Sequence, residues 1–289
     1  MATYYIATTG NDSTGAGTSG NPWLTISKAH TSASSGDTII CANGTYTMVS
    51  QTFTKSLTIQ ATTNNSVTFN ASSGNFSWTN ATNNVTITIT GINFTGNSSS
   101  ATNILFVAWS TNGSTFTFTD CKFYDLYGPS DLDNGGIFSV TANSSPGTFN
   151  FTNCLFYNLY CVDNTAGGGH APIISGRRYT ATFTNCTAYF NQSGTAYFKN
   201  VAKSQSGTGN IFTSKNCIWV ANSGTMTILA SVTSGSVTVT STYTCQYGNW
   251  STVTSGTGNT TSDPLFVDAA NGNFNLRPNS PCLDTGTSL

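Results

Sequence analysis

The sequence predicts an all-β protein built as a solenoid, in which successive turns stack short strands in parallel. A motif over residues 116–126 returns at 149–159 and then, more loosely, at 181–191 and 212–222. Within each copy, apolar and polar residues alternate over short stretches, which indicates strands rather than helices. A strand-rich repeat of about 30 residues is typical of a solenoid whose turns contact only their neighbours.

The composition also favours strands and turns. Only 7% of the residues are charged, all ten acidic residues are Asp, and Thr, Ser, Asn and Gly are abundant. This composition suits strands and tight turns better than helices. The net charge of −1 gives no basis for binding nucleic acid, and no apolar run is long enough for a transmembrane helix, so neither nucleic acid nor membrane insertion is expected.

A small residue occupies the same position in every unit. The seven equivalent residues are Ala61, Gly91, Cys121, Cys154, Cys186, Cys217 and Cys245. Equivalent residues on stacked strands lie about 4.8 Å apart, whereas the Cβ atoms of a disulfide lie about 3.8 Å apart. We therefore expect a ladder of buried thiols rather than of disulfides. The sequence does not pair Cys41, Cys161 and Cys282, which lie off the ladder.

The alternation changes phase beside each cysteine, so the chain bends there. The residues at the bend are Asp120, Asn153, Asn185 and Asn216. Asp and Asn tolerate a left-handed conformation better than other non-glycine residues. Each unit therefore contains strand one, a loop, strand two, a polar corner, strand three and a second loop. In this register strand one covers 137–140, 172–176, 195–200 and 227–231.

The first 36 residues are expected to form a strand and a capping helix. Trp23, Ile26 and His30 follow Pro22 at helical spacing, and Gly36 marks the stop. A helix at this place covers the open end of the solenoid, which would otherwise expose its core. In this setting His30 is interpreted as a structural residue.

Both ends of the chain resemble those of right-handed parallel β-helix proteins of the pectate-lyase-like superfamily. The segments that carry the resemblance are 4–6, 21–23, 36–38, 44–46, 263–268, 274–282 and 284–286. It covers nearly the whole chain and implies a right-handed single-stranded parallel β-helix of about seven or more turns. One structural unit is expected, with the cap at 1–36, the β-helix at 37–262 and a closing segment at 263–289. The superfamily includes lyases, hydrolases, phage tail spikes and non-catalytic adhesins, so the fold does not fix the activity.

The scarce charged residues define a candidate site. Ten of the 19 lie between positions 120 and 203. The loops that enter strand one carry Asp131, Asp133, Asp163 and His170, whereas Lys199 ends one such strand and Arg177, Arg178 and Lys203 follow on the exits. The acidic loops and basic exits are thus predicted to flank the strand-one face on neighbouring turns.

The resemblance implies two chemistries for that face. Lyases of this superfamily hold Ca²⁺ with carboxylates and abstract a proton with Lys or Arg, while tail-spike hydrolases use paired carboxylates. Asp131, Asp133 and Asp163 would supply metal ligands or the acid pair, and Arg177 or Lys199 the base. No lyase signature surrounds Arg177. We therefore favour ligand binding without chemistry and without a cofactor, and expect Ca²⁺ only in the lyase alternative.

The expected ligand is a polysaccharide or cell-surface glycan, because outward aromatic rings can stack on sugars. The predicted ligand-binding residues are His170, Arg178, Lys203, Tyr127, Tyr160 and Tyr197, and the further outward candidates are Tyr124, Tyr157, Tyr179 and Trp109. His170 lacks a second His or Cys at ligand spacing, so no metal site is predicted there. The favoured function is a non-catalytic, glycan-binding or structural protein of a virion or extracellular surface, without a signal peptide in this chain. A polysaccharide lyase or glycoside hydrolase is the alternative, and a homotrimer is left open.

Overall fold

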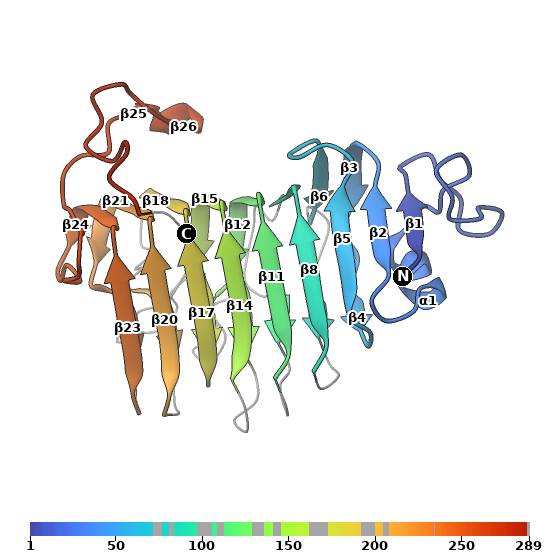
Figure 1. The fold of residues 1–289 in the computed structure, drawn as a ribbon, viewed down its shortest axis with the longest axis horizontal. Coiled ribbons are helices and arrows are strands. Elements are labelled where there is room, and N and C mark those ends of the chain that lie inside the picture. The colour runs from blue at the N-terminus through green and yellow to red at the C-terminus, as the bar shows by residue number, and fades with distance from the viewer. Residues whose placement is uncertain are drawn as a thin grey trace.

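The structure is a parallel β-helix and confirms the predicted all-β solenoid (Figure 1). The computed structural model describes residues 1–71, 77–80, 84–96, 106–108, 113–128, 136–140, 146–161, 173–191, 200–204, 208–233 and 235–287. Three parallel sheets run along the molecule and enclose one apolar core. We name them by the strand that each turn contributes: the strand-one, strand-two and strand-three sheets.

The strand-two sheet has nine strands and faces the viewer in Figure 1. Its alternation is clear in β11, where Phe116 and Phe118 are buried while Thr117 is partly exposed. Its strands are β1 (Thr3–Ile6), β2 (Thr38–Cys41), β5 (Leu57–Ala61), β8 (Thr86–Thr90), β11 (Thr115–Thr119), β14 (Gly147–Thr152), β17 (Tyr179–Thr184), β20 (Asn210–Lys215) and β23 (Val237–Thr242).

The strand-three sheet follows the corner and has eight strands. They are β3 (Gly44–Thr47), β6 (Val67–Asn70), β9 (Ile92–Thr95), β12 (Lys122–Gly128), β15 (Leu155–Cys161), β18 (Thr187–Asn191), β21 (Ile218–Met226) and β24 (Cys245–Trp250). A second bend lies within it, because Asp125 and Asn158 also have left-handed φ values of 52° and 48°. The sequence analysis missed this bend.

The strand-one sheet has seven shorter strands, so the chain passes through all three sheets seven times. They are β4 (Gln51–Phe53), β7 (Trp78–Asn80), β10 (Phe106–Ala108), β13 (Phe138–Val140), β16 (Ile174–Gly176), β19 (Asn200–Ser204) and β22 (Ile228–Val232). The prediction of strand one at 195–200 was wrong in register. The paired strand begins at Asn200, and Lys203 lies within it rather than on its exit.

Stacked aromatic rings fill the core between the sheets. Phe118 stacks on Phe151 with ring centroids 5.3 Å apart, and Phe151 stacks on Phe183 at 4.7 Å. Phe123 and Phe156 form a parallel column on the strand-three side at 5.1 Å. The strand register thus holds rings at equivalent positions of adjacent turns face to face. This stacking stabilises the fold in addition to the burial of apolar surface.

The predicted polar corner is confirmed. Asp120, Asn153, Asn185 and Asn216 have φ values of 53° to 54°, in the left-handed region that Asp and Asn adopt most readily among non-glycine residues. Each corner N–H donates to a carbonyl of the next turn, as from Asp120 to Thr152 at 3.0 Å.

The predicted small-residue slot is correct only for its four central cysteines. Gly91 pairs with the corner residue Asp120, and Ala61 lies in register with Gly91. At the other end Thr244, not Cys245, follows Cys217 in the column. The error was one residue at each end, because the corner itself is formed by Gly91 in one turn and by Tyr243 in the other, instead of by Asp or Asn.

The thiol ladder itself is buried and reduced, as predicted. Cys121, Cys154, Cys186 and Cys217 are free cysteines no more than 2% exposed. Each thiol donates to the carbonyl two residues earlier, at 3.2 to 3.3 Å. Burial raises the pKa of Cys154, Cys186 and Cys217 well above the usual thiol value. The ladder therefore acts as packing, without nucleophilic character.

The cap contains one helix, α1 (Ile26–Ser32), which begins later than predicted. The side chain of Thr25 caps it by accepting a hydrogen bond from the Lys28 N–H at 3.1 Å, whereas Trp23 forms a parallel bridge to Ile6. The buried ring of His30 accepts from the Thr54 N–H at 3.2 Å, which is a structural contact. In the described part of the chain, no helix is long and apolar enough to cross a membrane.

Asp37 ties the cap to the first turn and gives the stability an acid dependence. Its buried carboxylate accepts from the N–H groups of Ala2 at 2.6 Å and Ser34 at 2.8 Å, and these bonds lower the pKa of Asp37. Because the pKa of Asp37 in the folded protein lies below the ordinary Asp value, the ionised carboxylate stabilises the fold at pH values above that ordinary pKa. This stabilisation is lost as the pH falls through the folded-state pKa. We expect Asp37→Asn to melt below the wild type at about pH 7 and the gap to close below about pH 4. A gap independent of pH in thermal melts would contradict this.

The closing segment folds back over the outer face of the strand-three sheet (Figure 1). It contains β25 (Phe266–Asp268), the short 3₁₀ helix η1 (Ala269–Asn271) and β26 (Asn273–Leu276). Phe274 packs on the outward rings of Tyr157 and Tyr189, with centroids 5.2 and 5.5 Å apart. Its end is held at the corner column, where Asn216 Nδ2 donates to the Thr287 carbonyl at 2.8 Å and the Thr287 N–H returns a bond of 3.0 Å.

Candidate functional site

The middle of the described strand-one face, around β13 and β16, is covered. Ser139 and Ser175 point outward from β13 and β16, yet only 0% and 6% of their surfaces are exposed. The N–H of Gly136 donates to Ser175 Oγ at 2.8 Å, so the chain that enters β13 lies against this surface. These small side chains therefore do not line an open cleft.

Three predicted cationic residues do come together at the end of this face. Lys203 stands in register with Ser175, and Arg177 and Arg178 follow β16 directly. The backbone fixes this turn, since the Arg177 N–H donates to the Val140 carbonyl at 3.0 Å and Ser204 Oγ donates to the Arg177 carbonyl at 2.6 Å. All three side chains are partly exposed. Two neighbouring turns thus present three positive charges.

The remaining predicted site residues are not tested by the structure. Asp131, Asp133, Asp163, His170, Lys199 and Tyr197 lie outside the described residues. Tyr127 and Tyr160 occupy paired positions of β12 and β15 in the strand-three sheet, away from the strand-one face. Among the described residues, no three His, Cys, Asp or Glu side chains are grouped to hold a metal ion.

A polar recess of about 220 Å³ opens on the corner side instead. Its lining residues are Asn64, Asn65, Asp120, Cys121, Lys122, Asn153 and Leu155. The Asp120 carboxylate is held from both sides, because Asn153 Nδ2 donates to Oδ1 and Asn64 Nδ2 donates to Oδ2, each at 3.1 Å. The recess thus contains one carboxylate in a fixed orientation.

Gly91 makes the contact between Asn64 and Asp120 possible. It lies at the corner of the turn between them, with φ of 73°. A Cβ atom at this position would stand 2.4 Å from Asn64 Oδ1, inside contact distance. The absence of a side chain lets Asn64 reach across a whole turn to the carboxylate.

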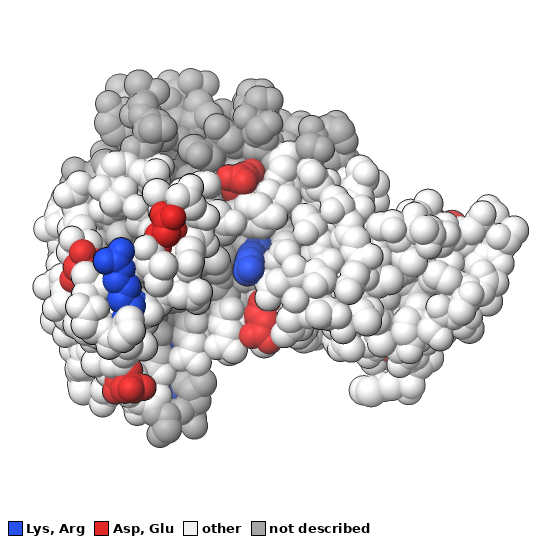
Figure 2. Space-filling view, turned by 90° about the horizontal axis from the view of Figure 1, so that it is seen from above, with Lys and Arg blue, Asp and Glu red and all other residues white. Residues whose placement is uncertain are grey.

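An aromatic column continues the recess along the outer face. Tyr124 points outward two residues after Lys122 and stacks on Tyr157, with centroids 5.1 Å apart and planes within 3°. Burial raises the pKa of Tyr157 to about 12, because the closing segment covers it, whereas Tyr124 lies beyond Phe274 and is partly exposed. Figure 2 views the molecule from this side and shows the few charged side chains standing apart on a largely uncharged surface.

Asn93 adds a free hydrogen-bond acceptor beside Lys122. The two residues are paired in β9 and β12, and Asn93 is 7% exposed. Its Nδ2 donates to the Asn65 carbonyl at 3.0 Å, while its Oδ1 has no hydrogen-bond partner within the described structure. Buried polar atoms are normally satisfied, so Asn93 Oδ1 is an exception that lies below the surface.

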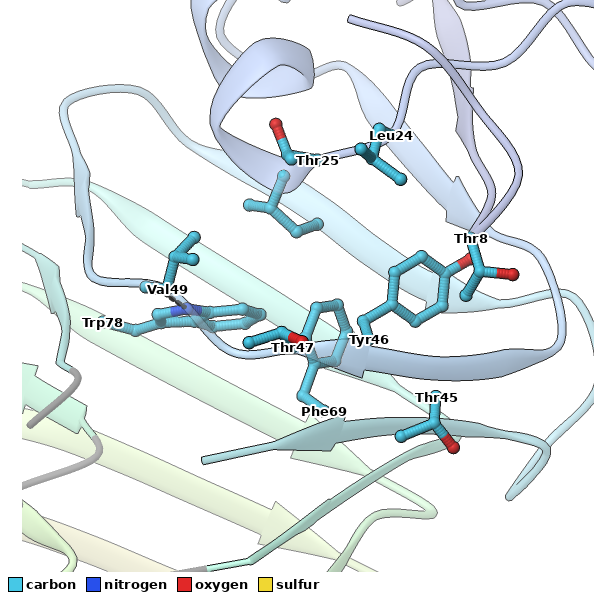
Figure 3. A pocket seen from close by; sticks show the side chains of 10 residues that line it. Thr8, Leu24, Thr25, Thr45, Tyr46, Thr47, Val49, Phe69 and Trp78 are labelled. Atoms are coloured by element: carbon cyan, nitrogen blue, oxygen red, sulfur yellow. Dashed lines mark hydrogen bonds between the residues drawn. The ribbon is translucent and has the colours of Figure 1, made fainter. Parts of the chain in front are cut away.

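A second recess, of about 270 Å³, lies at the capped end between α1 and β3 (Figure 3). The rings of Tyr46, Phe69 and Trp78 form its floor, and the Tyr46 and Phe69 centroids are 5.2 Å apart. The polar atoms of these rings are used internally, since the Tyr46 hydroxyl donates to the Ala42 carbonyl at 2.7 Å and Trp78 Nε1 to that of Val49 at 3.1 Å. This recess is a mainly apolar gap between cap and core.

Known structures share the fold at low sequence identity. The chain is similar to pectate lyase Pel9A, with 17% identity and a TM-score of 0.50 over 100% of this chain and 92% of that one. A rhamnogalacturonan lyase matches with 16% identity and a TM-score of 0.47 over 86% of this chain and 69% of that one. No protein-family model matches the sequence, and no curated protein matches it. The similarity to the Pel9A structure shows a shared parallel β-helix fold.

Sequence reasoning recognised Asp120 only as a corner residue. The signal that distinguishes it was present, because this corner carries Asp where the next three carry Asn. Its partner Asn64 precedes the regular motif by more than one turn, and Gly91 between them was assigned to the wrong register. Tyr124 was predicted to point outward, but the sequence does not show that the closing segment covers Tyr157 and leaves Tyr124 exposed.

Proposed function

We propose that this protein is a non-catalytic, glycan-binding β-helix protein of a virion or extracellular surface, and that it binds sugar at the outer face of the strand-three sheet. The observation that carries the proposal is the Asp120 carboxylate, fixed by two amides beside the Lys122 ammonium and the Tyr124 ring. We name this set the corner site: Asn64, Asp120, Lys122, Tyr124 and Asn153.

The corner site offers the contacts that a sugar requires. Sugar hydroxyls are donors and acceptors, and the Asp120 carboxylate and the Lys122 ammonium supply both kinds of partner. The open face of Tyr124 can pack against the apolar face of a sugar ring. Because amides and strand register hold these groups in place, little conformational entropy is lost on binding.

The charges favour neutral glycans over polyanions. Asp120 and the neighbouring exposed Asp125 carry two negative charges against the one positive charge of Lys122. No described residue forms an ion pair with Lys122. A chain of uronic acids would meet net repulsion here, whereas a neutral glycan would use the carboxylate as a strong acceptor.

Asp120→Asn provides the sharpest test. The substitution suits the corner, because Asn already occupies the equivalent position in the next three turns with nearly the same φ. Hydrogen bonds to a charged acceptor contribute about 1 to 1.5 kcal/mol more than bonds to a neutral one, so we expect about tenfold weaker binding. A glycan array would select ligands for the wild type, and calorimetry would then compare the two proteins.

Asp284→Asn is the matched control, since it removes an exposed carboxylate from the closing segment, and it should bind like the wild type. Reducing-end and unsaturated-product assays on the bound glycans are expected to show no release. Equal affinity of the wild type and Asp120→Asn would refute the corner site. Release of oligosaccharide products would refute a non-catalytic role.

The three cations at the end of the strand-one face support a second candidate, a polysaccharide lyase or glycoside hydrolase acting there. Arg177, Arg178 and Lys203 suit an acidic polysaccharide, and a Lys or Arg can act as a base when its pKa is lowered. Asp131, Asp133, Asp163 and Lys199 stay predictions for this reading, as does Ca²⁺ in a lyase. Unsaturated products from an acidic polysaccharide, lost in Arg177→Ala, would establish it.

A further inference from the structure

Cys245 differs from the ladder thiols in the direction of its side chain. It is paired with Ile218, one position beyond Cys217, and it therefore lies in the outward column of the strand-three sheet that contains Thr187 and Leu155. Thr244 takes the inward place, and its hydroxyl donates to the Thr242 carbonyl at 3.1 Å as the ladder thiols do. An outward thiol at this edge is available to a group outside the β-helix.

The closing segment covers this outward thiol. Cys245 is only 3% exposed, and its Sγ donates to the Ser262 carbonyl at 3.1 Å. Cys282 lies on the same segment, and both cysteines line one recess together with Leu276 and Gly286. The Cys245 and Cys282 side chains are neighbours in this recess, and each thiol affects the acidity of the other. A strand end and the last part of the closing segment thus meet at two sulfur atoms.

The two sulfurs have unequal acidity. The neighbouring Cys245 thiol lowers the pKa of Cys282, burial opposes this change, and Ser280 adds to the lowering. The same contact, followed by burial, raises the pKa of Cys245. Cys282 is also partly exposed, whereas the other free cysteines of the described structure are buried. Cys282 is therefore the thiol that a reagent in solution reaches first.

We propose that Cys245 and Cys282 form a disulfide that fastens the closing segment to the last turn of the β-helix. The Cys282 thiolate attacks one sulfur of a low-molecular-weight disulfide, such as oxidised glutathione, and one thiol leaves. Cys245 then loses its proton and attacks Cys282 Sγ, and the second thiol leaves. The cysteine pair loses two electrons and two protons, and the reagent becomes two thiols.

The consequence is a covalent lock on a segment that is otherwise held by a few contacts. Its other described attachments include the packing of Phe274 on Tyr157 and Tyr189 and the hydrogen bonds between Asn216 and Thr287. With the lock closed, Tyr157 and Tyr189 stay covered. The proposal does not depend on glycan binding.

The test uses the full chain, which contains eight cysteines. The protein is incubated with oxidised or reduced glutathione, denatured, alkylated and weighed, and its peptides are mapped. Oxidation is expected to remove two alkylatable thiols and to yield a linked peptide pair containing Cys245 and Cys282. Alkylation of all eight thiols after oxidation, or a linked pair without Cys245, would overturn the proposal.

Limited proteolysis supplies a second readout. We expect the closing segment of the oxidised wild type to be released at least about tenfold more slowly than that of the reduced protein. Cys282→Ser removes a partly exposed thiol and should fold normally, as circular dichroism would verify, with release equally fast under both conditions. A redox effect of the same size in Cys282→Ser would also contradict the proposal.

Discussion

Replacing Phe118 with alanine is expected to lower the free energy of unfolding by about 3 to 5 kcal/mol, the range found for buried Phe truncations. The ring is fully buried at the centre of the core. Its centroid lies 4.9 Å from that of Phe106, 5.3 Å from those of Phe123 and Phe151, and 5.4 Å from that of Phe138. Strand register holds these rings at fixed heights, so they cannot collapse into the space that the alanine leaves.

Urea denaturation followed by circular dichroism would measure this loss. Phe118→Leu keeps much of the apolar volume and should lose clearly less. Thr117→Ala changes the adjacent, outward-facing residue and should stay within about 0.5 kcal/mol of the wild type. A loss below about 1.5 kcal/mol in Phe118→Ala would show that the turns relax around the gap and that the columns are not rigid.

The sequence was sufficient to predict the three-strand turn because its determinants are local. Period-two alternation marks each strand, and a left-handed bend requires Asn, Asp or Gly at one position. Both signals recur with every turn, so each copy supports the next. The N-terminal helix was predicted to start too early because Trp23 stands at helical spacing from Ile26. Trp23 instead pairs with Ile6, which is a long-range contact that local spacing does not reveal.

The strand register at the two ends of the repeat and the position of the corner site could not be predicted from these local signals. Whether Gly91 aligns with Asp120 or Cys121 depends on which residue forms the corner, and a shift of one residue reverses the face of every side chain. The same shift hid the outward direction of Cys245. The closing segment folds back on turns far from it in sequence, so the exposure of Tyr124 and the cover over Tyr157 follow from packing alone.

A large backbone effect is expected at Gly176, where alanine should lower the free energy of unfolding by about 3 kcal/mol or more. Gly176 ends β16 with φ of 135°, a conformation that costs other residues about 1 to 3 kcal/mol. A Cβ atom here would also stand 2.3 Å from the Val140 carbonyl oxygen and 2.6 Å from the Val140 nitrogen. Both are backbone atoms within a paired strand, so neither can move aside without opening the sheet.

Gly20→Ala is the matched control, because a Cβ atom at Gly20 meets nothing within 4 Å, and its stability should stay within about 0.5 kcal/mol of the wild type. Equal melting of Gly176→Ala and Gly20→Ala would contradict the strain at β16.

The Gly176 variant also separates the two functional readings, because Gly176 directly precedes Arg177 and sets where this side chain leaves the strand-one sheet. At a temperature where the variant is folded, a lyase or hydrolase that depends on Arg177 should lose activity. Glycan binding at Asp120 and Tyr124 should persist, since these residues belong to the corner and the strand-three sheet, whose pairing does not pass through Gly176. Loss of glycan affinity in the folded variant would place the binding surface on the strand-one face instead.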